Sequence, residues 1–279
     1  MNMSLPIYIP KKGRPMNVIV FASGGGGNLK AIVDMSIKKS SLVKVGLVVT
    51  DRLGIPAIDI AKSCSIPVFA YDFESICGIW AINKKKEKTA NQYTECARTF
   101  HNMVLKQIKE LEKKMKEPFD LIVLSYHRWV FGDLLTHFKN RIINQHAADV
   151  TVMRKDNKRE RKYIGINPVL YALVAGEKRT RTSTFLVQNG YDNGEILCQG
   201  PWVKYTGVHP PTKKSAYDHE LIQKRESDWP SLTFAIEGIA RGYFSILSSE
   251  LHPDGCQTIY YMDTKLPYGG VDLTITSFK

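Results

Sequence analysis

The chain has 279 residues, which is enough for one large domain, and its 43% hydrophobic and 24% charged residues are typical of a globular protein. No apolar run reaches the roughly 18 residues of a membrane span, which excludes a protein with transmembrane helices. The net charge of +12 favours anionic partners. No nucleic-acid-binding motif accompanies the basic runs, so we expect small anionic molecules rather than nucleic acid.

The N-terminal residues and the cysteines indicate where the protein works. Residues 1–15 carry their charges after a short apolar stretch that prolines interrupt, the reverse of the order in a signal peptide. We therefore expect a flexible N-terminal extension and a cytoplasmic protein. The 5 cysteines are widely spaced and have no companion histidines at metal-ligand intervals, so we expect reduced thiols and no metal site.

Strand and helix patterns alternate through the first half of the chain. Short runs rich in β-branched residues, apolar on both faces, predict strands of a parallel sheet at residues 16–22, 42–50, 66–73, 119–126 and 141–146. Helical patterns lie between them, at residues 28–39, 55–64, 91–117 and 130–138. This alternation predicts an α/β fold with a doubly wound, mostly parallel sheet and a Rossmann-like N-terminal half.

The second half of the chain has a more mixed pattern. Residues 167–177 are predicted as a helix, and residues 182–188 and 195–205 as strands. Residues 215–244 contain two helical stretches, with a break expected near Pro230 because proline lacks the backbone N–H. Residues 246–279 are rich in turns with short β-prone pieces. We predict a mixed C-terminal half.

Four consecutive glycines stand between the first predicted strand and the first predicted helix, in "SGGGGNL" at residues 23–29. Backbone N–H groups in such a loop can approach a phosphate closely, and the helix dipole favours negative charge there. Neither the dinucleotide fingerprint nor the P-loop fits, because Leu29 stands at the third glycine position and no glycine precedes Lys30. A tight turn with Asn28 as helix N-cap is the alternative, and the loop alone leaves both open.

Candidate polar groups follow the fifth predicted strand. Asn144 and His146 are two residues apart, so they lie on the same side of an extended chain, at its carboxyl end. Ligands bind at this edge of open α/β sheets. Asp192 lies in a turn between two later strands and can be presented into a site, although turn aspartates and strand-end histidines are more often structural.

Taken in order, these motifs resemble those of the glycinamide ribonucleotide formyltransferases. That family has "SGxGSNL" after its first strand, "NxHPSLLP" at the end of its fifth strand and "DxGxxxxQ" in a later hairpin. Here the matching segments are "SGGGGNL" (23–29), "NQH" (144–146) and "DNGEILCQ" (192–199). The resemblance implies a formyltransferase fold over residues 16–245, with extensions at residues 1–15 and 246–279.

The resemblance also implies an activity and a set of site residues. The implied reaction transfers a formyl group from 10-formyltetrahydrofolate to the amine of glycinamide ribonucleotide, without a metal. An amine attacking the formyl carbon produces an oxyanion, which needs oriented donors and a proton acceptor. The implied roles are catalysis for Asn144, His146 and Asp192, phosphate binding for Gly25, Gly26, Gly27 and Asn28, ribose binding for Glu226, and folate binding, largely through backbone groups, for Arg128, Trp129, Val130, Asn189, Gly190 and Tyr191.

Several positions depart from the family pattern. Ala147 and Ala148 replace the usual Pro-Ser, and Asn167, Arg181 and Phe185 stand where the family has histidine, glycine and histidine. The segment between His146 and Gly165 is longer than usual and basic. Its residues Lys158, Arg159 and Arg161 either hold a phosphate or the folate glutamates, or belong to a mobile solvated loop. The spacing between Glu226 and Pro230 also differs by one residue from the family's.

These departures leave three alternatives open. The same chemistry can act on another amine, such as a nucleotide-linked amino sugar. The same catalytic residues can direct water to 10-formyltetrahydrofolate and release formate. A non-catalytic ligand-binding protein can retain the fold.

Overall fold

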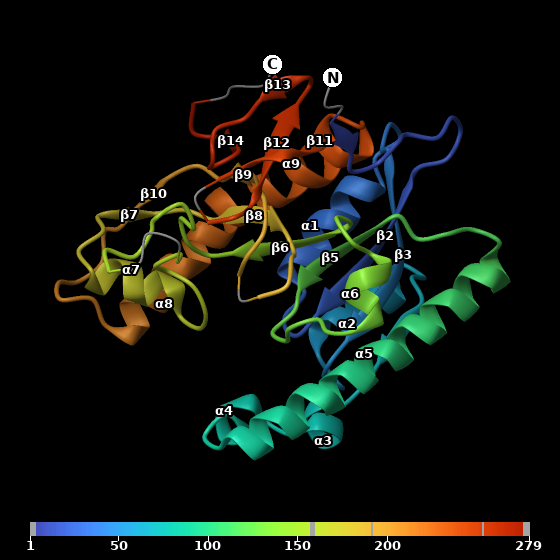
Figure 1. Ribbon diagram of the computed structural model, residues 1–279, viewed down its shortest axis with the longest axis horizontal. Helices are drawn as coiled ribbons and strands as arrows, with labels where there is room; N and C mark the ends of the chain where they lie inside the picture. The colour runs from blue at the N-terminus through green and yellow to red at the C-terminus, as the bar shows by residue number, and fades with distance from the viewer. Residues whose placement is uncertain (1–3, 157–159, 191, 253, 276–279) are drawn as a thin grey trace. The chain divides into compact units, whose positions relative to one another are not determined.

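The computed structural model describes residues 4–156, 160–190, 192–252 and 254–275 (Figure 1). The chain divides into two compact units. The N-terminal unit comprises Met16–Ile142, and the C-terminal unit comprises Ile143–Lys279 together with Met1–Pro15.

The N-terminal unit is built on a parallel sheet. Its strands are β2 (Met16–Ala22), β3 (Val43–Thr50), β4 (Val68–Ala70) and β5 (Leu121–Ser125), in the order β5-β2-β3-β4. Every residue of β2 is buried, as expected for a strand that is covered on both faces. The predicted strand at 66–73 is shorter in the structure, because Phe73 begins a helix.

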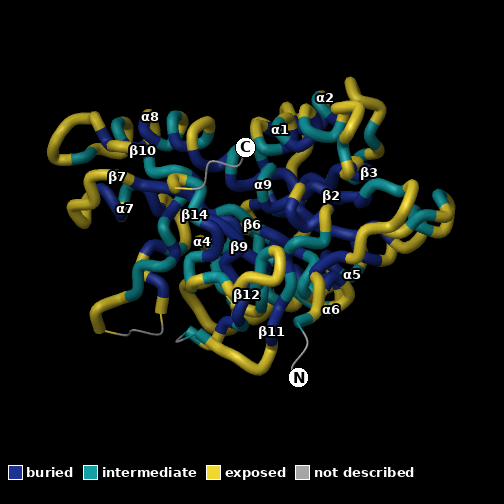
Figure 2. The backbone as a smooth tube through the Cα atoms, turned by 90° about the horizontal axis from the view of Figure 1, so that it is seen from above, coloured by how far each residue is buried: buried dark blue, intermediate teal, exposed yellow. Residues whose placement is uncertain are grey.

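Helices cover both faces of this sheet. Figure 2 shows α1 (Gly27–Ser36) and α2 (Pro56–Ser63) on one side of β2 and β3, and α5 (Glu87–Met115) and α6 (Asp133–His137) on the other. The short helices α3 (Phe73–Cys77) and α4 (Trp80–Asn83) pack against α5. The buried residues of α5 recur at helical spacing through Ala97, Phe100, Val104 and Ile108, so that one stripe of the long helix faces the core.

His101 lies in an aromatic cluster of this core. Its side chain is fully buried, and its ring centroid lies 6.1 Å from that of Phe73 and 6.2 Å from that of Tyr126. Nδ1–H donates to the carbonyl of Ala97 at 2.7 Å, whereas Nε2 has no hydrogen-bond partner in the part of the chain that the structure describes. Burial lowers the pKa of His101 to about 4, so the imidazole is neutral in the folded protein at neutral pH.

The C-terminal unit contains a mixed sheet. β6 (Ile142–His146) begins at the boundary and pairs antiparallel with β8 (Ser183–Leu186), which pairs antiparallel with β9 (Ile196–Gln199). β14 (Val271–Asp272) pairs parallel with β9. A separate ribbon joins β7 (Arg179–Thr180) to β10 (Val203–Lys204), and α7 (Pro168–Val174) packs against β7. The predicted α/β class and the mixed second half are confirmed.

The predicted helix break near Pro230 is wrong. α8 (Lys213–Gln223), the π-helical turn η1 (Lys224–Asp228) and α9 (Trp229–Ala240) follow one another without a gap. Pro230 lies in the first turn of α9, next to the π-helical turn. A proline is tolerated at that point, because the π-helical turn already interrupts the regular α-helical hydrogen-bond pattern.

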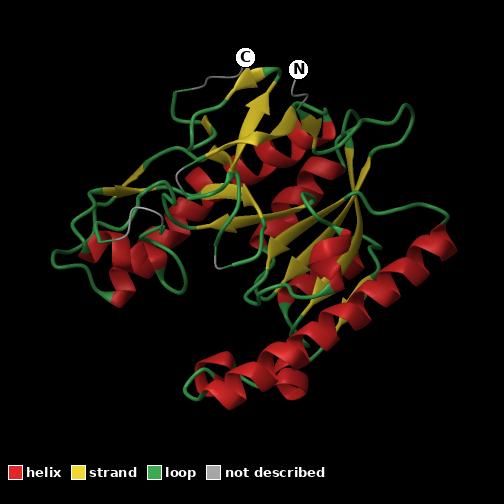
Figure 3. Ribbon diagram, viewed as in Figure 1, coloured by secondary structure: helices red, strands yellow, loops and turns green. Residues whose placement is uncertain are grey.

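The two ends of the chain form part of the C-terminal unit. β1 (Leu5–Pro6), β11 (Phe244–Leu251), β12 (Gln257–Tyr261) and β13 (Thr264–Lys265) make an antiparallel sheet in that order (Figure 3). Where the sequence predicts a flexible N-terminal extension, β1 pairs with β11 and Ile7 is buried. None of the described helices is both long and apolar enough to cross a membrane.

We predict that His101 makes the stability of the protein depend on pH. In the unfolded chain its pKa returns to about 6.5, so below that pH the unfolded state binds more protons. The stabilising effect of a neutral His101 is therefore complete above pH 6.5 and is lost as the pH falls towards the folded-state value of about 4. Relative to His101→Phe, the free energy of unfolding of the wild type falls by about 3 kcal/mol between pH 7 and pH 4. Urea unfolding of both proteins at several pH values measures this difference, and parallel pH profiles would contradict it.

Candidate functional site

The carboxyl end of β6 carries two of the predicted catalytic residues. Asn144 lies opposite Phe185 of β8, and His146 lies opposite Ser183. Because successive side chains alternate along a strand, Asn144 and His146 are on the same face. Asn144 is half-buried and His146 is buried.

Both ring nitrogens of His146 face oxygen atoms. Nε2–H donates to the backbone carbonyl of Tyr163 at 2.8 Å, and Nδ1 lies 3.5 Å from Oδ1 of Asp192. A carbonyl oxygen only accepts, so Nε2 carries a proton in this arrangement. With a second proton on Nδ1, the His146 ring would be positively charged and would form an ion pair with the Asp192 carboxylate. The ring is then held at Nε2 by Tyr163 and at Nδ1 by Asp192.

The turn after β8 holds Asp192 in place. Oδ2 of Asp192 accepts from the backbone N–H of Gly165 at 2.8 Å, and the backbone at Asp192 is left-handed with a φ of 42°. Gly194 has a φ of 135°, and a Cβ there would lie 1.8 Å from the carbonyl oxygen of Leu186. Only glycine fits at that position, so the turn geometry depends on it.

The structure thus brings together His146 and Asp192, and Asn144 lies on the same strand face. A direct hydrogen bond from His146 to an oxyanion would need a ring N–H that has no other partner. In this conformation Nε2–H is engaged by the carbonyl of Tyr163 and Nδ1 faces Asp192. Tyr163 was not predicted as a site residue, and no sequence signal marks it, because the contact uses a backbone carbonyl.

The glycine loop of the N-terminal unit contains glycines with different environments. Gly26, not Asn28, is the N-cap of α1, with a φ of 76°. A Cβ on Gly26 would lie 2.7 Å from Cδ1 of Ile60, so glycine is required there by the fold. By contrast, a Cβ on Gly24 or Gly25 would meet nothing within 4 Å. Packing therefore does not explain the glycines at these two positions.

The segment after β5 lies beside this loop. Ser23, at the start of the loop, accepts through Oγ from the backbone N–H of His127 at 2.8 Å. The ring centroid of Trp129 lies 5.1 Å from that of Trp80, at an interplanar angle of 84°, and Val130 is buried. The predicted phosphate loop and the predicted folate residues 128–130 therefore share the carboxyl edge of one sheet, as expected for a ligand site in an α/β fold.

The side chain of Arg128 is used within the protein. Its Nε–H donates to Oδ2 of Asp51 at 2.7 Å, and its Nη2–H donates to Oε1 of Glu74 at 2.7 Å. Burial alone would lower the pKa of the Arg128 guanidinium, but the hydrogen bonds to Glu74 and Asp51 raise it. Neither carboxylate was predicted as a site residue, although Asp51 directly follows a predicted strand.

The remaining predicted site residues lie in the C-terminal unit. Asn189 and Gly190 belong to the turn that holds Asp192, while Tyr191 lies outside the described residues. Glu226 is exposed and lies in the π-helical turn η1. A π-helical turn contains more residues than an α-helical one and changes which side chains share a face. The one-residue difference in spacing before Pro230 therefore lies in the segment where the α-helix is interrupted by the π-helical turn.

Arg181, which replaces a family glycine, has acidic partners on two separate segments. Its Nε lies 3.2 Å from Oδ2 of Asp149, and its Nη1–H donates to Oδ2 of Asp272 at 2.8 Å. Gln199, the final residue of the "DxGxxxxQ" match, donates to Oδ1 of Asp149 at 2.6 Å. These contacts connect the segment after His146 to β14 of the C-terminal extension.

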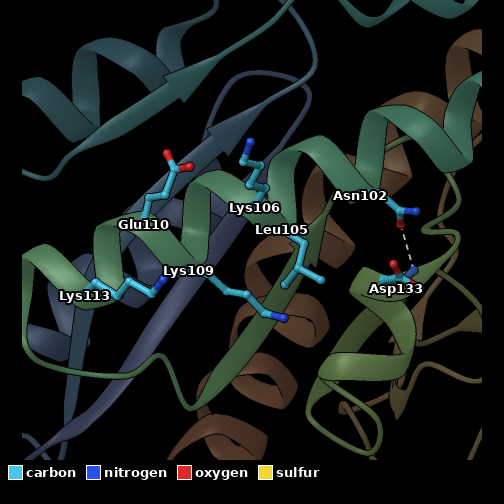
Figure 4. Close-up of a pocket in the computed structure, with 7 residues that line it drawn as sticks. All are labelled: Asn102, Leu105, Lys106, Lys109, Glu110, Lys113 and Asp133. Carbon is cyan, nitrogen blue, oxygen red and sulfur yellow. Dashed lines mark hydrogen bonds between the residues drawn. The ribbon is translucent and has the colours of Figure 1, made fainter.

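A separate surface pocket lies away from the predicted residues. It has a volume of about 340 Å³ and lies between α5 and α6 (Figure 4). Lysines and acidic residues line it together, and the N–H of Asp133 donates to Oδ1 of Asn102 at 2.8 Å. None of the predicted site residues lines this pocket. The described residues also include no cluster of three or more His, Cys, Asp or Glu side chains suited to a metal.

Comparison with known proteins identifies the class. Residues 16–204 match the family model described as formyl transferase, and this chain belongs to that family. The motif resemblance is therefore confirmed as far as the formyl transferase family. Among curated relatives, a methionyl-tRNA formyltransferase from Finegoldia magna is 31% identical over 91 residues, which cover 33% of this chain and 26% of that protein.

Another relative matches over a longer stretch. The phosphoribosylglycinamide formyltransferase of Bacillus subtilis is 27% identical over 181 residues, which cover 64% of this chain and 75% of that protein. A solved phosphoribosylglycinamide formyltransferase from Coxiella burnetii has the same fold, with a TM-score of 0.63 at 19% identity over 93% of this chain and 99% of that one. A formyltetrahydrofolate deformylase from Pseudomonas syringae pv. tomato aligns with a TM-score of 0.58 at 14% identity, over 89% of this chain and 67% of that one.

We predict that Arg128 stabilises the N-terminal unit by pairing Asp51, whose side chain is 0% exposed. Arg128→Met leaves that carboxylate buried without its close partner and lowers the free energy of unfolding by about 3–5 kcal/mol. Adding Asp51→Asn to this variant recovers part of the loss. The matched control is Arg52→Met, because Arg52 lies 3.9 Å from the same carboxylate but is 46% exposed. Urea unfolding measures all three variants, and equal losses for Arg128→Met and Arg52→Met would contradict the prediction.

Proposed function

We propose that this protein transfers the formyl group of 10-formyltetrahydrofolate to the primary amine of glycinamide ribonucleotide. The observation that carries the proposal is the pairing of His146 with Asp192, 3.5 Å apart, at the strand end that also carries Asn144. Membership of the formyl transferase family supports formyl transfer, and a folate-derived donor follows from the family resemblance. The acceptor is proposed from the motifs and from the longer match to a phosphoribosylglycinamide formyltransferase.

The reaction forms one C–N bond and breaks another. The substrate amine attacks the formyl carbon, and the carbonyl oxygen becomes an oxyanion as the amine nitrogen becomes positive. Collapse of this intermediate breaks the bond to N10 of the folate, and N10 takes up a proton. The site must therefore stabilise negative charge at oxygen and remove a proton from the new amide nitrogen.

The three residues divide these tasks according to their geometry. Asn144 supplies a side-chain N–H donor for the oxyanion. The His146 ring, engaged by Tyr163 and Asp192, acts as a fixed positive charge beside that donor when Nδ1 is protonated. The Asp192 carboxylate receives the amine proton, directly or through a water. Charge that is held in place before the reaction stabilises the intermediate without reorganisation.

The substrate phosphate is proposed to bind the loop from Gly25 to Asn28. The open space over Gly24 and Gly25 supports this, as does the first turn of α1, which has no acidic residue. The pterin is proposed to bind backbone groups of Arg128, Trp129 and Val130, together with residues 189–191. Glu226, which is exposed, is proposed to contact the ribose. Oδ1 of Asp51 and the hydroxyl of Tyr126 are buried without hydrogen-bond partners among the described residues, and polar ligand groups can satisfy such atoms.

One experiment separates this function from its alternatives. The purified protein is incubated with 10-formyltetrahydrofolate in separate reactions that contain glycinamide ribonucleotide, methionyl-tRNA, a nucleotide-linked amino sugar or no acceptor. Tetrahydrofolate formation that requires glycinamide ribonucleotide supports the proposal. Formate release without an acceptor would indicate a hydrolase, and folate binding without turnover in any reaction would indicate a binding protein.

We predict that His146→Ala and Asp192→Asn each lower kcat by about 100- to 10,000-fold, because each removes charge from the reacting centre. Thermal unfolding by circular dichroism checks that the variants remain folded. Asp218→Asn is the matched control, since this carboxylate is 53% exposed on α8, and it should keep wild-type turnover. Full turnover in either test variant would show that the assignment is wrong.

We predict that substitutions at two neighbouring glycines have different effects, one on substrate binding and the other on stability. Gly25→Ala leaves the melting temperature unchanged, because its Cβ meets nothing within 4 Å, but it raises the KM for glycinamide ribonucleotide by crowding the phosphate. Gly26→Ala lowers the melting temperature, because its φ is 76° and its Cβ lies 2.7 Å from Cδ1 of Ile60. Steady-state kinetics and thermal unfolding measure both effects. An unchanged KM in Gly25→Ala would show that the loop does not bind the substrate phosphate.

A further inference from the structure

Arg161 comes from the basic segment that lengthens this chain after His146. Met153 and Arg161 pair as an antiparallel bridge, and the N–H of Lys162 donates to the carbonyl of Val152 at 2.7 Å, so the segment folds back on itself. The sequence leaves open whether Arg161 binds an anion or belongs to a mobile solvated loop. Its side chain is only 4% exposed and donates to backbone carbonyls of the protein.

The guanidinium of Arg161 binds the backbone of the Asp192 turn. Nη1–H donates to the carbonyl of Asp192 at 2.7 Å, and Nη2–H donates to the carbonyl of Gly194 at 2.6 Å. A planar guanidinium can bind two acceptors in a fixed geometry, which a lysine ammonium cannot. Asp192 has a left-handed backbone, which is unfavourable for a residue with a side chain. The arginine thus fixes the turn that presents the Asp192 carboxylate to His146.

The C-terminal extension supplies the partners of this arginine. Oδ2 of Asp254 lies 3.2 Å from Nη2, and the hydroxyl of Tyr268 accepts from Nε–H at 3.2 Å. The Arg161 guanidinium carbon also lies 5.6 Å from the ring centroid of Phe185 and 5.9 Å from that of Tyr268. The Tyr268 hydroxyl donates in turn to Asp254. The Tyr268 hydroxyl and the Asp254 carboxylate thus provide acceptors and a negative charge for the N–H groups of Arg161.

The charges in this cluster remain ionised despite burial. Burial alone would lower the pKa of Arg161, but Tyr268, Cys256 and Asp254 raise it. Burial alone would raise the pKa of Asp254, but the hydrogen bond from Tyr268 and the Arg161 charge lower it. A buried pair of this kind is costly to break, because removing one partner leaves the other charge unpaired.

We propose that Arg161 is a positioning residue for formyl transfer, which, braced by Asp254 and Tyr268, holds the Asp192 carboxylate against His146. Residues 246–252 and 254–275 are then part of the active-site framework rather than an appendage. This inference rests on the proposed function for its kinetic consequence, but the contact that it describes can be tested without any substrate.

The kinetic test compares substitutions of graded severity. Arg161→Met lowers kcat by about 100-fold, because displacing a catalytic group by as little as 1 Å has an effect of that size. Arg161→Lys recovers part of the loss, since it restores the charge but not the fork. Tyr268→Phe, which removes only a hydroxyl, gives a smaller loss and covers the case in which Arg161→Met fails to fold. The control is Arg154→Met, which removes an arginine that is 48% exposed from the same segment and should leave kcat unchanged.

The substrate-free test is the NMR signal of the His146 ring protons, which reports the contact with Asp192. In Arg161→Met and Tyr268→Phe this signal moves towards its position in Asp192→Asn, whereas in Arg154→Met it stays at the wild-type position. If Arg161→Met and Tyr268→Phe keep both the wild-type signal and the wild-type kcat, the inference is overturned. If the wild type does not turn over glycinamide ribonucleotide but the signal moves as expected, the proposed acceptor fails while the positioning role stands.

Discussion

The structure depends on one electrostatic constraint, which is that a charge removed from water must be paired. Three buried arginines meet this constraint by bridging distant parts of the chain: Arg128 with Asp51 and Glu74, Arg161 with Asp254, and Arg181 with Asp149 and Asp272. Each arginine has side-chain exposure of 8% or less. Such pairs add little net stability relative to apolar packing, but they tolerate few alternative arrangements. Their contribution is therefore to fix geometry.

Within each unit, these arginines tie down segments that carry predicted site residues. Arg128 ties the segment after β5 to the end of β3 and to α3, next to the glycine loop. Arg161 ties the Asp192 turn to the C-terminal extension, and Arg181 ties the segment after His146 to β14. Two of these arginines, Arg161 and Arg181, lie at positions that depart from the family pattern. At both positions the arginine pairs with an acidic residue of the C-terminal extension, Asp254 for Arg161 and Asp272 for Arg181.

Local sequence patterns predicted a large part of the fold and some of the site. The strands of the N-terminal unit are apolar on both faces and were predicted to within a few residues, and the two-residue spacing of Asn144 and His146 was enough to put them on one face. The prediction of Asp192 as a site residue depended on the order of several motifs along the chain, because an aspartate in a turn has no local sequence signature of a site. Asp51 stands out in the sequence because it directly follows a predicted strand, but its pairing with Arg128 was not predictable, since 77 residues separate the two. The same holds for Arg161 and Asp254, which are 93 residues apart. Pro230 misled the prediction because the π-helical turn before it removes the usual cost of a proline.

The glycine loop shows how the structure sharpens an interpretation that the sequence left open. A turn that needs a positive φ and a loop that admits a phosphate both require glycine, and the two explanations were expected to compete. They apply instead to different residues: Gly26 is required by its backbone and by its packing against α2, whereas Gly24 and Gly25 have ordinary φ values and open space around them. A glycine that neither its backbone conformation nor its packing requires leaves space in which a ligand can approach the backbone. The fold therefore accounts for Gly26, whereas no packing contact accounts for Gly24 and Gly25, and the open space at these two residues is compatible with the proposed phosphate loop.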